Sequence, residues 1–408
     1  MGNETSQPKK PTKKAGKKKA GGAKKATPAK TASSTATNGA TKSSSGAGMG
    51  AIAEDAEDDT GGDNMAFIMN KKLTINDFTF LKVVGKGSFG KVMQVRKNDD
   101  GKIYALKVLK KKELVKRKQV VHTQTERKVL AGIDNPFIVS LRFSFQSDAK
   151  LYMVLDFFNG GELFFHLKNE GRFSQKRSKF YSGEICLALK CLHANGIIYR
   201  DLKPENVLLD HEGHIKITDF GLSKDSLKGD MITHTFCGTP EYLAPEVLHQ
   251  QGHGKAVDWW SFGTLLYEMM TGLPPFYNEN LNIMYEKILH APIPLPKYLT
   301  KEARSIFLGL LERDPKRRLG SSDKDAEEIE QHPFYKDIDW VKLYNKEIKP
   351  PFKPKVKDEN DTSNVDEEFT EEVPKDTLVD KTGSMLAAKD MFVGFTYDEN
   401  KATTNALK

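Results

Sequence analysis

The sequence predicts an α+β fold of two lobes, a small β-rich lobe followed by a larger helical one. Short runs with the alternation of β-strands occupy residues 78–158 and are separated by glycine and Asn-Asp turns. From Leu163 onward, apolar residues recur three or four positions apart, as they do in amphipathic helices. The glycine pair Gly160-Gly161 marks the change between the two patterns. A cleft between two such lobes is a natural ligand site.

The positive charge of the chain is concentrated at its amino terminus. The 408 residues include 63 Lys and Arg against 55 Asp and Glu, a net charge of +8. Residues 1–48 hold eleven lysines and one acid, so the other 360 residues, with 52 basic and 54 acidic groups, carry a net charge of −2. This distribution argues against a nucleic-acid-binding fold.

Cysteine usage and apolar content indicate a reducing intracellular compartment. The three cysteines, Cys186, Cys191 and Cys237, form no Cys-x-x-Cys pair, which excludes a disulfide framework and a cysteine-rich zinc site. No run approaches about eighteen apolar residues, and the amino terminus has no apolar signal segment. We therefore expect a cytoplasmic protein.

Composition divides the chain into three regions. Residues 1–76 combine a head of Lys, Ala, Gly, Ser and Thr with an acidic linker, and we expect them to be disordered because they have too little apolar surface to offset the entropy of folding. Residues 78–334 form the folded domain, with lobes 78–158 and 159–334. Residues 335–408 are first proline-rich and then acidic, and we expect this tail to wrap around the domain.

A glycine-rich loop at residues 85–90 joins the first two predicted strands, which lie around Phe80 and Val95. In a dinucleotide-binding fold such a loop leads from a strand into a helix, whereas here both flanks are strands. This context favours a flap whose backbone amides cover nucleotide phosphates, and a glycine-rich hairpin without a ligand is the alternative. The contacts expected are Val84, Gly85, Lys86, Gly87, Ser88, Phe89, Gly90, Lys91 and Val92.

The third predicted strand, Ile103–Val108, carries Lys107, which faces inward if Ala105 does. A buried lysine requires an anion. Two candidates exist, namely ATP phosphates and Glu126, which lies in the helix predicted around residues 121–129. A strand lysine that is held by a helix glutamate and reaches the phosphates is typical of protein kinases.

Three motifs then follow in a fixed order in the helical half. They are Tyr199-Arg-Asp201-Leu-Lys203-Pro-Glu-Asn206, Asp219-Phe-Gly221 and Ala244-Pro-Glu246. With the glycine loop and the strand lysine, they make residues 78–334 resemble the eukaryotic protein-kinase family. The resemblance implies the bilobal protein-kinase fold and phosphoryl transfer from ATP with Mg²⁺.

The same resemblance implies a role for each polar residue of these motifs. Asp201 orients the substrate hydroxyl and accepts its proton, while Lys203 offsets charge on the transferred phosphoryl group. Asn206 and Asp219 hold the magnesium ions. The adenine is expected on backbone groups of the segment between the lobes. The further residues expected at the nucleotide are Lys107, Asp156 and Phe158.

Lys203, two residues after the aspartate, resembles serine/threonine kinases and not tyrosine kinases, so we expect a serine or threonine acceptor. The alternative is a pseudokinase, a membrane-tethered scaffold that has kept the fold and lost the chemistry. None of the residues that transfer requires is replaced. These residues are Lys107, Glu126, Asp201, Asn206 and Asp219.

Tyr199 stands where most protein kinases have histidine, a change that is usual in the AGC group. The segment that begins Thr235-Phe-Cys-Gly resembles the activation loop of that group, which makes Thr235 the expected target of an upstream activating kinase. A phosphate there would add about two negative charges, which Arg200 and His122 are expected to pair.

The tail carries a second AGC signature. Phe392-Val-Gly-Phe395-Thr396-Tyr resembles the hydrophobic motif of the protein kinase B (Akt), SGK and ribosomal-protein S6-kinase branch. We expect both phenylalanines to dock beside the Glu126 helix, and phosphate added to Thr396 by an upstream kinase to strengthen this docking. Thr377 aligns with a turn-motif phosphorylation site, although no proline follows it.

Three acidic residues indicate the substrate class. Glu162, Glu205 and Glu268 match positions at which basophilic AGC kinases recognise arginine before the target residue. We therefore expect protein substrates with Arg at position −3.

The basic head predicts membrane attachment. Gly2 with Ser6 fits the N-myristoylation pattern, and the lysines of residues 9–30 add attraction to anionic lipids, which a single myristoyl chain needs for stable binding. We expect a monomer at the inner face of the plasma membrane, with this attachment in place of a PH domain. The alternative is a nuclear protein, since Lys9-Lys10 and Lys17-Lys18-Lys19 resemble a bipartite import signal.

Overall fold

The computed structural model describes residues 72–87, 89–225, 238–376 and 390–400. Residues 70–408 form one compact unit, whereas residues 1–69 belong to another unit, which lies outside the described residues. The described chain begins with the short 3₁₀ helix η1 (Ile75–Asp77), because Thr74 donates its backbone N–H to the Asp77 carboxylate over 2.8 Å and so closes the first turn.

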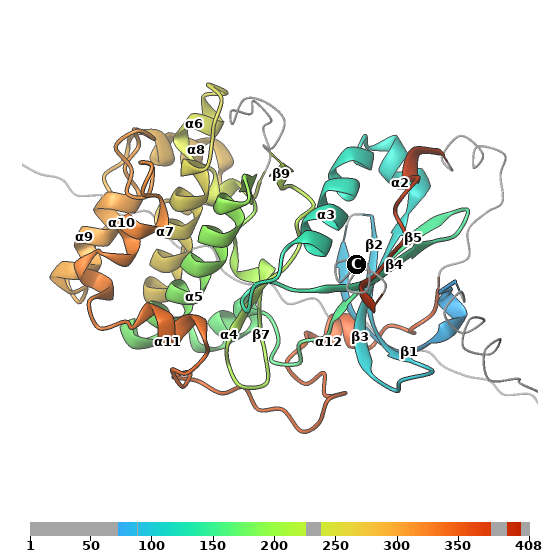
Figure 1. The fold of residues 1–408 in the computed structure, drawn as a ribbon. Helices are drawn as coiled ribbons and strands as arrows, with labels where there is room; N and C mark the ends of the chain where they lie inside the picture. The colour runs from blue at the N-terminus through green and yellow to red at the C-terminus, as the bar shows by residue number, and fades with distance from the viewer. Residues whose placement is uncertain (1–71, 88, 226–237, 377–389, 401–408) are drawn as a thin grey trace, which may run out of the picture. The chain divides into compact units, whose positions relative to one another are not determined.

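Within the described residues, six strands form the antiparallel sheet of the first lobe, in the spatial order β1-β2-β3-β5-β4-β10 (Figure 1). Its core is made by alternate residues such as Val83, Val95, Leu106 and Val154, all fully buried. The strands are β1 (Phe78–Gly87), β2 (Gly90–Lys97), β3 (Ile103–Lys110), β4 (Leu141–Gln146), β5 (Lys150–Asp156) and β10 (Tyr397–Asp398). The strands predicted around the glycine loop are confirmed, whereas β10, contributed by the tail, was not predicted.

Helices α2 (Lys111–Lys116) and α3 (Val120–Gly132) follow β3. Thr123, Glu126, Val129 and Leu130 of α3 are buried, which is the spacing of one helical face. The helix predicted around residues 121–129 is confirmed, although Val121, on which the prediction partly rested, is 69% exposed. The buried face includes one carboxylate, that of Glu126.

The second lobe is built around two long helices, α5 and α7, which pack against each other (Figure 1). Ser174 caps α5 by accepting the N–H of Arg177, and the stripe expected on this helix, from Tyr181 to Leu192, is fully buried. None of the described helices is long and apolar enough to cross a bilayer. The helices are α4 (Leu163–Glu170), α5 (Gln175–Ala194), α6 (Pro245–Leu248), α7 (Ala256–Thr271), α8 (Leu281–His290), α9 (Lys301–Leu310), α10 (Ala326–Glu330) and α11 (Trp340–Tyr344).

Two small β-ladders lie at the start of the second lobe and carry the chemical motifs between them. β6 (Ile197–Ile198) pairs with β9 (Lys224–Asp225), and β7 (Val207–Leu209) pairs with β8 (Ile215–Ile217). The β7–β8 turn is closed by Asp210, whose Oδ1 accepts the N–H groups of the next residues 212, 213 and 214 at 2.9–3.0 Å.

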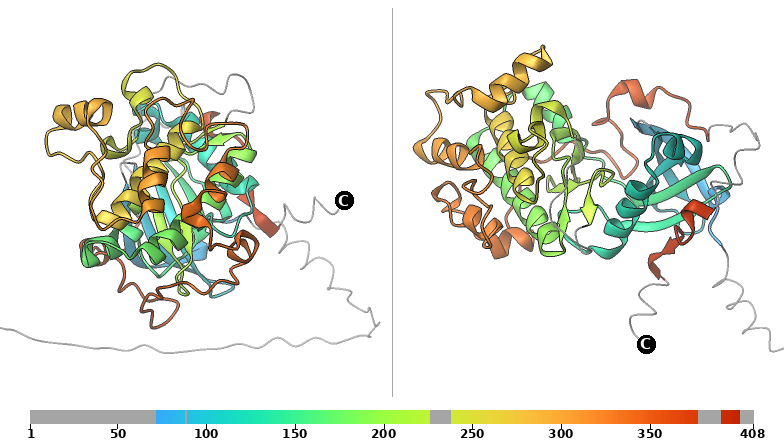
Figure 2. Two further views of the ribbon diagram at one scale, coloured as in Figure 1. Left: turned by 90° about the vertical axis from the view of Figure 1, so that its left-hand side faces the viewer. Right: turned by 90° about the horizontal axis from the view of Figure 1, so that it is seen from above.

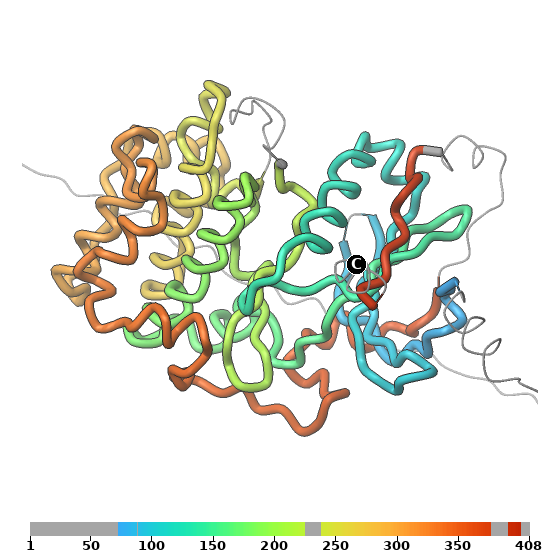
Figure 3. The backbone as a smooth tube through the Cα atoms, viewed as in Figure 1, coloured from blue at the N-terminus to red at the C-terminus, as the bar shows by residue number. Residues whose placement is uncertain are grey.

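The tail returns from the second lobe to the first, as the orange and red parts of the tube show (Figure 3). Asn364 donates to the carbonyl of Asn159 over 3.0 Å, at the junction of the lobes. Helix α12 (Glu367–Thr370) then lies against β1, with Phe369 packed on the sheet core. The red segment, which contains η5 (Asp390–Phe392) and β10, runs along the sheet lobe in both further views (Figure 2). The expectation that the tail wraps around the domain is met by these contacts.

Candidate active site

An ion-pair cluster joins the sheet, helix α3 and the second lobe, with Glu126 buried, Lys107 partly buried and Asp219 exposed. Lys107 projects from β3 and donates to Glu126 Oε1 of α3 over 2.6 Å, and to Asp219 Oδ1 over 3.1 Å. Glu126 is 3% exposed, so its carboxylate has few partners other than this ammonium. The structure therefore brings together three residues that the sequence separates by up to 112 positions.

The charges of this cluster stabilise one another. Burial opposes the charged form of Lys107, but the carboxylates of Asp219 and Glu126 outweigh it, so that the lysine pKa lies above its usual value. Lys107 is also the main cause of the lowered pKa of Asp219. Both groups are consequently ionised at neutral pH.

The glycine loop is shaped by close backbone packing. A Cβ atom on Gly90 would lie 1.6 Å from the carbonyl oxygen of Val108, so only glycine fits where β2 meets β3. Lys86 and Lys91 on either side of the loop both form ion pairs with Glu372 of the tail, the second over 2.6 Å. Two lysines expected at the nucleotide therefore also hold the tail, while Ser88 lies outside the described residues.

The start of the segment between the lobes, at Asp156, is held by a side chain of the sheet. Arg142 of β4 makes two hydrogen bonds to the carboxylate of Asp156, at 2.7 and 2.8 Å, and its other nitrogen pairs with Glu399. The Asp156 side chain is therefore occupied, which leaves the backbone of this segment for an adenine. The ammonium nitrogen of Lys216 lies over the ring of Phe158, 5.3 Å from the centre of the ring.

The second-lobe motifs converge on Asp201. Asn206 donates its side-chain amide to Asp201 Oδ2 over 2.9 Å, and Lys203 Nζ lies 3.4 Å from the same oxygen. Thr239, which the sequence analysis did not single out, bridges Lys203 and Asp201 through its hydroxyl. Burial raises the pKa of Asp201, and Lys203 opposes this shift.

A backbone hydrogen bond joins the segment of Asn206 to the segment of Asp219. Asn206 ends the 3₁₀ helix η2 (Pro204–Asn206), and its carbonyl accepts the N–H of Thr218 over 3.0 Å, next to Asp219. No group of three or more His, Cys, Asp or Glu side chains among the described residues is arranged to hold a metal ion. One carboxylate and one amide suit Mg²⁺, which usually takes one or two protein carboxylates and completes its shell with water and substrate phosphates.

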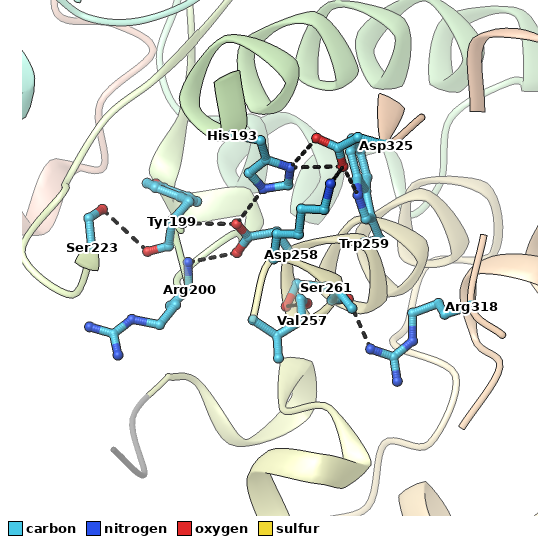
Figure 4. A network of polar contacts seen from close by, with 12 residues as sticks. His193, Tyr199, Arg200, Ser223, Val257, Asp258, Trp259, Ser261, Arg318 and Asp325 are labelled. Carbon is cyan, nitrogen blue, oxygen red and sulfur yellow. Dashed lines mark hydrogen bonds and ion pairs between the residues drawn. The ribbon is translucent and has the colours of Figure 1, made fainter. Parts of the chain in front are cut away.

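A buried carboxylate holds the backbone of Tyr199 and Arg200 (Figure 4), at the start of the loop that carries Asp201, called here the catalytic loop. Asp258 of α7 is fully buried and accepts the N–H groups of Tyr199 and Arg200 over 2.9 and 2.8 Å. Arg200 has a φ of +68° and Asp219 one of +58°, a conformation that non-glycine residues rarely adopt without support. The sequence analysis missed Asp258, since an aspartate in a helical pattern carries no local signal of this role.

The three predicted substrate carboxylates cluster around Glu205. Burial, followed by the charge of Glu205, raises the pKa of Glu162 to about 7. The pKa of Glu268 is likewise raised to about 7 by burial, and again by Glu205, although Tyr242 donates a hydrogen bond to it. Like charges gathered in this way form a site suited to a cation.

The hydrophobic motif of the tail is docked against α3 and β4. Phe392 and Phe395 are 0% and 2% exposed. Their carbonyls accept hydrogen bonds from Gln146 and Ser144 of β4, at 2.9 and 2.6 Å. Arg127, the neighbour of Glu126 on α3, donates to the carbonyl of Thr396 over 3.1 Å. The predicted position of the two phenylalanines beside the Glu126 helix is met by these contacts.

Two predicted modification sites, Gly2 and Thr235, lie outside the described residues, as does Thr377. The expected partners of a phosphate on Thr235 are described. Burial and the charge of Arg200 lower the pKa of His122, so the two side chains are close enough to interact.

Comparison with known proteins agrees with this geometry. The family model of the protein kinase domain matches residues 78–335, and that of the protein kinase C terminal domain matches residues 356–397. The first of these covers more than half of the chain.

Named relatives point to the same group. The chain is 58% identical over 328 residues to the serine/threonine-protein kinase YPK2/YKR2 of Saccharomyces cerevisiae, covering 80% of this chain and 48% of the relative. It is 52% identical over 329 residues to a RAC family serine/threonine-protein kinase homolog of Dictyostelium discoideum, covering 80% and 73%. To the ribosomal protein S6 kinase beta of Caenorhabditis elegans it is 49% identical over 332 residues, covering 80% and 60%.

The chain spans about half the length of the yeast kinase, 48%, and 60% of the length of the Caenorhabditis elegans kinase. Both regions that the family models recognise, the kinase domain and its carboxy-terminal extension, are present and in order. The chain therefore belongs to the AGC group of serine/threonine protein kinases.

Proposed function

We propose that this chain is an active, ATP-dependent serine/threonine protein kinase. The observation that carries the proposal is that Lys107, Glu126 and Asp219 converge in one ion-pair cluster, and that Asp201, Lys203 and Asn206 converge in a second polar cluster. Each residue that a pseudokinase typically loses is present, ionised or hydrogen-bonded.

ATP and Mg²⁺ fit the groups that line this cleft. Lys107 would bind phosphate oxygens in exchange for part of its bond to Asp219, and the backbone of the glycine loop would cover them. Asp219 and Asn206 would hold Mg²⁺, which supplies neutralisation of the charge on the phosphates. Asp201 then orients the acceptor hydroxyl and takes its proton at the carboxylate, while Lys203 keeps a positive charge beside it.

The acidic cluster supports a basic substrate. Burial and, to a smaller extent, the charge of Glu205 raise the pKa values of Glu162 and Glu268, so Glu205 repels both carboxylates. The positive charge of an arginine guanidinium would relieve this repulsion, and its planar group can donate two parallel hydrogen bonds to a carboxylate. We propose that protein substrates carry Arg at position −3 from the target Ser or Thr.

Phosphorylation of Thr235 and Thr396 by upstream kinases is proposed to activate the enzyme. Arg200 and His122, which lie near each other, would pair a phosphate on Thr235. Thr396 is exposed and its carbonyl already accepts from Arg127, so a phosphate on its hydroxyl would add a charged contact to α3. Both events bear on the position of Glu126.

We further propose that the head attaches the kinase to the inner face of the plasma membrane, through a myristoyl group on Gly2 and the lysines of residues 9–30. The pattern at Gly2 and the charge of the head support this proposal. A nuclear location is the alternative, and it uses the same lysines without the lipid.

The first prediction concerns transfer itself. Asp219→Ala removes a carboxylate that faces Lys107, and we expect kcat for an arginine-containing peptide to fall more than about a hundredfold. Asp323→Ala, at an exposed position, is the control and should act like the wild type. Phosphate transfer is measured with radiolabelled ATP. If wild-type protein with phosphate on both threonines binds ATP and transfers none, the enzyme proposal fails and the scaffold alternative stands.

The second prediction concerns pH. Because the pKa values of Glu162 and Glu268 are raised to about 7, both carboxylates gain protons and lose charge as the pH falls below 7. We expect kcat/KM for a peptide with Arg at −3, relative to one with Ala at −3, to fall about tenfold between pH 8 and pH 6. A ratio that is constant with pH would exclude the acidic cluster as the arginine site.

The third prediction concerns the docked tail. Phe395→Ala leaves a cavity beside α3, which costs roughly 3–5 kcal/mol of docking free energy. We expect kcat/KM to fall at least about tenfold, and amide hydrogen exchange in α3 to speed up. Val393→Ala is the matched control, since Val393 lies in the same segment and is 78% exposed. Equal activity of the two variants would show that docking does not support the ion pair.

The fourth prediction concerns the head. Peptide mass spectrometry of protein from its own cells should find myristate on Gly2, and Gly2→Ala should abolish binding to vesicles that contain phosphatidylserine. A free or acetylated amino terminus would rule out the lipid and leave the kinase proposal untouched.

A further inference from the structure

One buried histidine, His193, lies between two carboxylates, those of Asp258 and Asp325 (Figure 4). His193, near the end of α5, has a side chain only 1% exposed. Its Nε2 lies 2.9 Å from Asp258 Oδ2, and its Nδ1 lies 3.0 and 3.1 Å from the two oxygens of Asp325. A carboxylate only accepts hydrogen bonds, so both ring nitrogens must donate, and the ring is then an imidazolium.

The electrostatic surroundings agree with this protonation state. Burial favours the neutral ring, but the hydrogen bonds and charges of Asp258 and Asp325 outweigh it and raise the pKa of His193 to about 9. The other charged group in this network is Lys255, 3.7 Å from Asp325 Oδ1, just before α7. The two carboxylates and the two cations balance one another.

Asp325 is held in an unusual conformation to make this contact. Its backbone lies at φ +49° and ψ −123°, a region that residues other than glycine seldom occupy. It also stands at the N-cap of α10, where an aspartate ordinarily caps the helix, yet its carboxylate makes no capping bond. The carboxylate instead accepts from Trp259 Nε1 over 2.7 Å and faces His193. Asp325 thus has a strained backbone and makes no capping hydrogen bond, which indicates that its contact with His193 has a function.

The partner of His193 on the other side is the carboxylate that holds the catalytic loop. Asp258 Oδ2, which faces His193, also accepts the N–H of Tyr199, and its Oδ1 accepts the N–H of Arg200. Arg200 has a positive φ and directly precedes Asp201. A cation at His193 fixes the orientation of this carboxylate through the contact between Nε2 and Oδ2.

We propose that Asp325 is a positioning residue for phosphoryl transfer, which acts by holding His193 as a cation that orients Asp258 and thereby the backbone before Asp201. The inference rests on the proposed kinase activity. It assigns a role in the reaction to a loop of the second lobe that touches neither nucleotide nor peptide.

The test uses the full chain with Asp325→Asn. The asparagine can accept from Trp259 and donate to Nδ1 of a neutral His193, so it keeps the hydrogen bonds and removes the charge. We expect kcat to fall about tenfold at pH 8, while KM for ATP and for peptide stays the same. Asp323→Asn, an exposed aspartate two residues earlier, is the matched control and should keep the wild-type kcat.

The pH dependence separates this role from a structural one. A raised pKa means that His193 carries its charge below about pH 9 in the wild type, whereas in Asp325→Asn it should carry it only below about its ordinary value of 6.5. The kcat ratio of wild type to variant should therefore be largest between these two pH values and shrink on either side. Asp325→Glu keeps the charge and should restore most of the wild-type profile.

Imidazole resonances of isotope-labelled histidine, followed by NMR against pH, provide a readout that does not depend on activity. A wild-type His193 that titrates at or below pH 7 overturns the proposal, even if Asp325→Asn fails to fold. So does a folded Asp325→Asn variant with the wild-type kcat and pH profile. If the wild type transfers no phosphate, the proposed function fails, and the NMR titration still decides the charge of His193.

Discussion

Much of this structure depends on the pairing of one partly buried ammonium, that of Lys107, with carboxylates. Lys107 projects from β3 with its side chain only 17% exposed, and an isolated charge would be costly there. It is stabilised only when Glu126 arrives from α3 and Asp219 from the second lobe. The ion pair therefore requires the sheet, the helix and the second lobe to be in one particular arrangement, which is also the arrangement that phosphoryl transfer needs.

The position of α3 depends in turn on the tail. Phe392 and Phe395 bury their rings beside this helix, and β10 extends the sheet at the edge of β4. Gln124 and Arg127, on either side of Glu126, donate to tail carbonyls over 2.7 and 3.1 Å. A segment some 270 positions away in the sequence thus helps to orient the carboxylate that holds the catalytic lysine. This coupling gives a physical route by which modification of the tail can alter the cleft.

The second lobe is held differently, by polar groups that are almost fully buried. Asp258 fixes the backbone of the catalytic loop, and Arg318 makes two hydrogen bonds to Glu246 at 2.6 and 2.9 Å, both side chains being almost fully buried. Breaking such a buried pair typically costs roughly 3–5 kcal/mol. The loop that carries Asp201 is thus held by buried polar contacts within the second lobe.

The sequence alone indicated the β-rich and helical halves, the strands on either side of the glycine loop, and the motif residues that we expect to carry the chemistry. These features are local, because period-two and period-3.6 patterns and short motifs such as Asp219-Phe-Gly221 are legible along the chain. It also indicated that the tail docks beside α3, because the motif Phe392–Tyr397 is contiguous. Only the tertiary structure decided that β10 joins the sheet, that Thr239 bridges Lys203 and Asp201, that Glu372 takes up Lys86 and Lys91, and that His193 lies between Asp258 and Asp325. Such contacts join residues tens to hundreds of positions apart, and a single aspartate or histidine in a helical pattern does not show which distant group it will meet until the chain has folded.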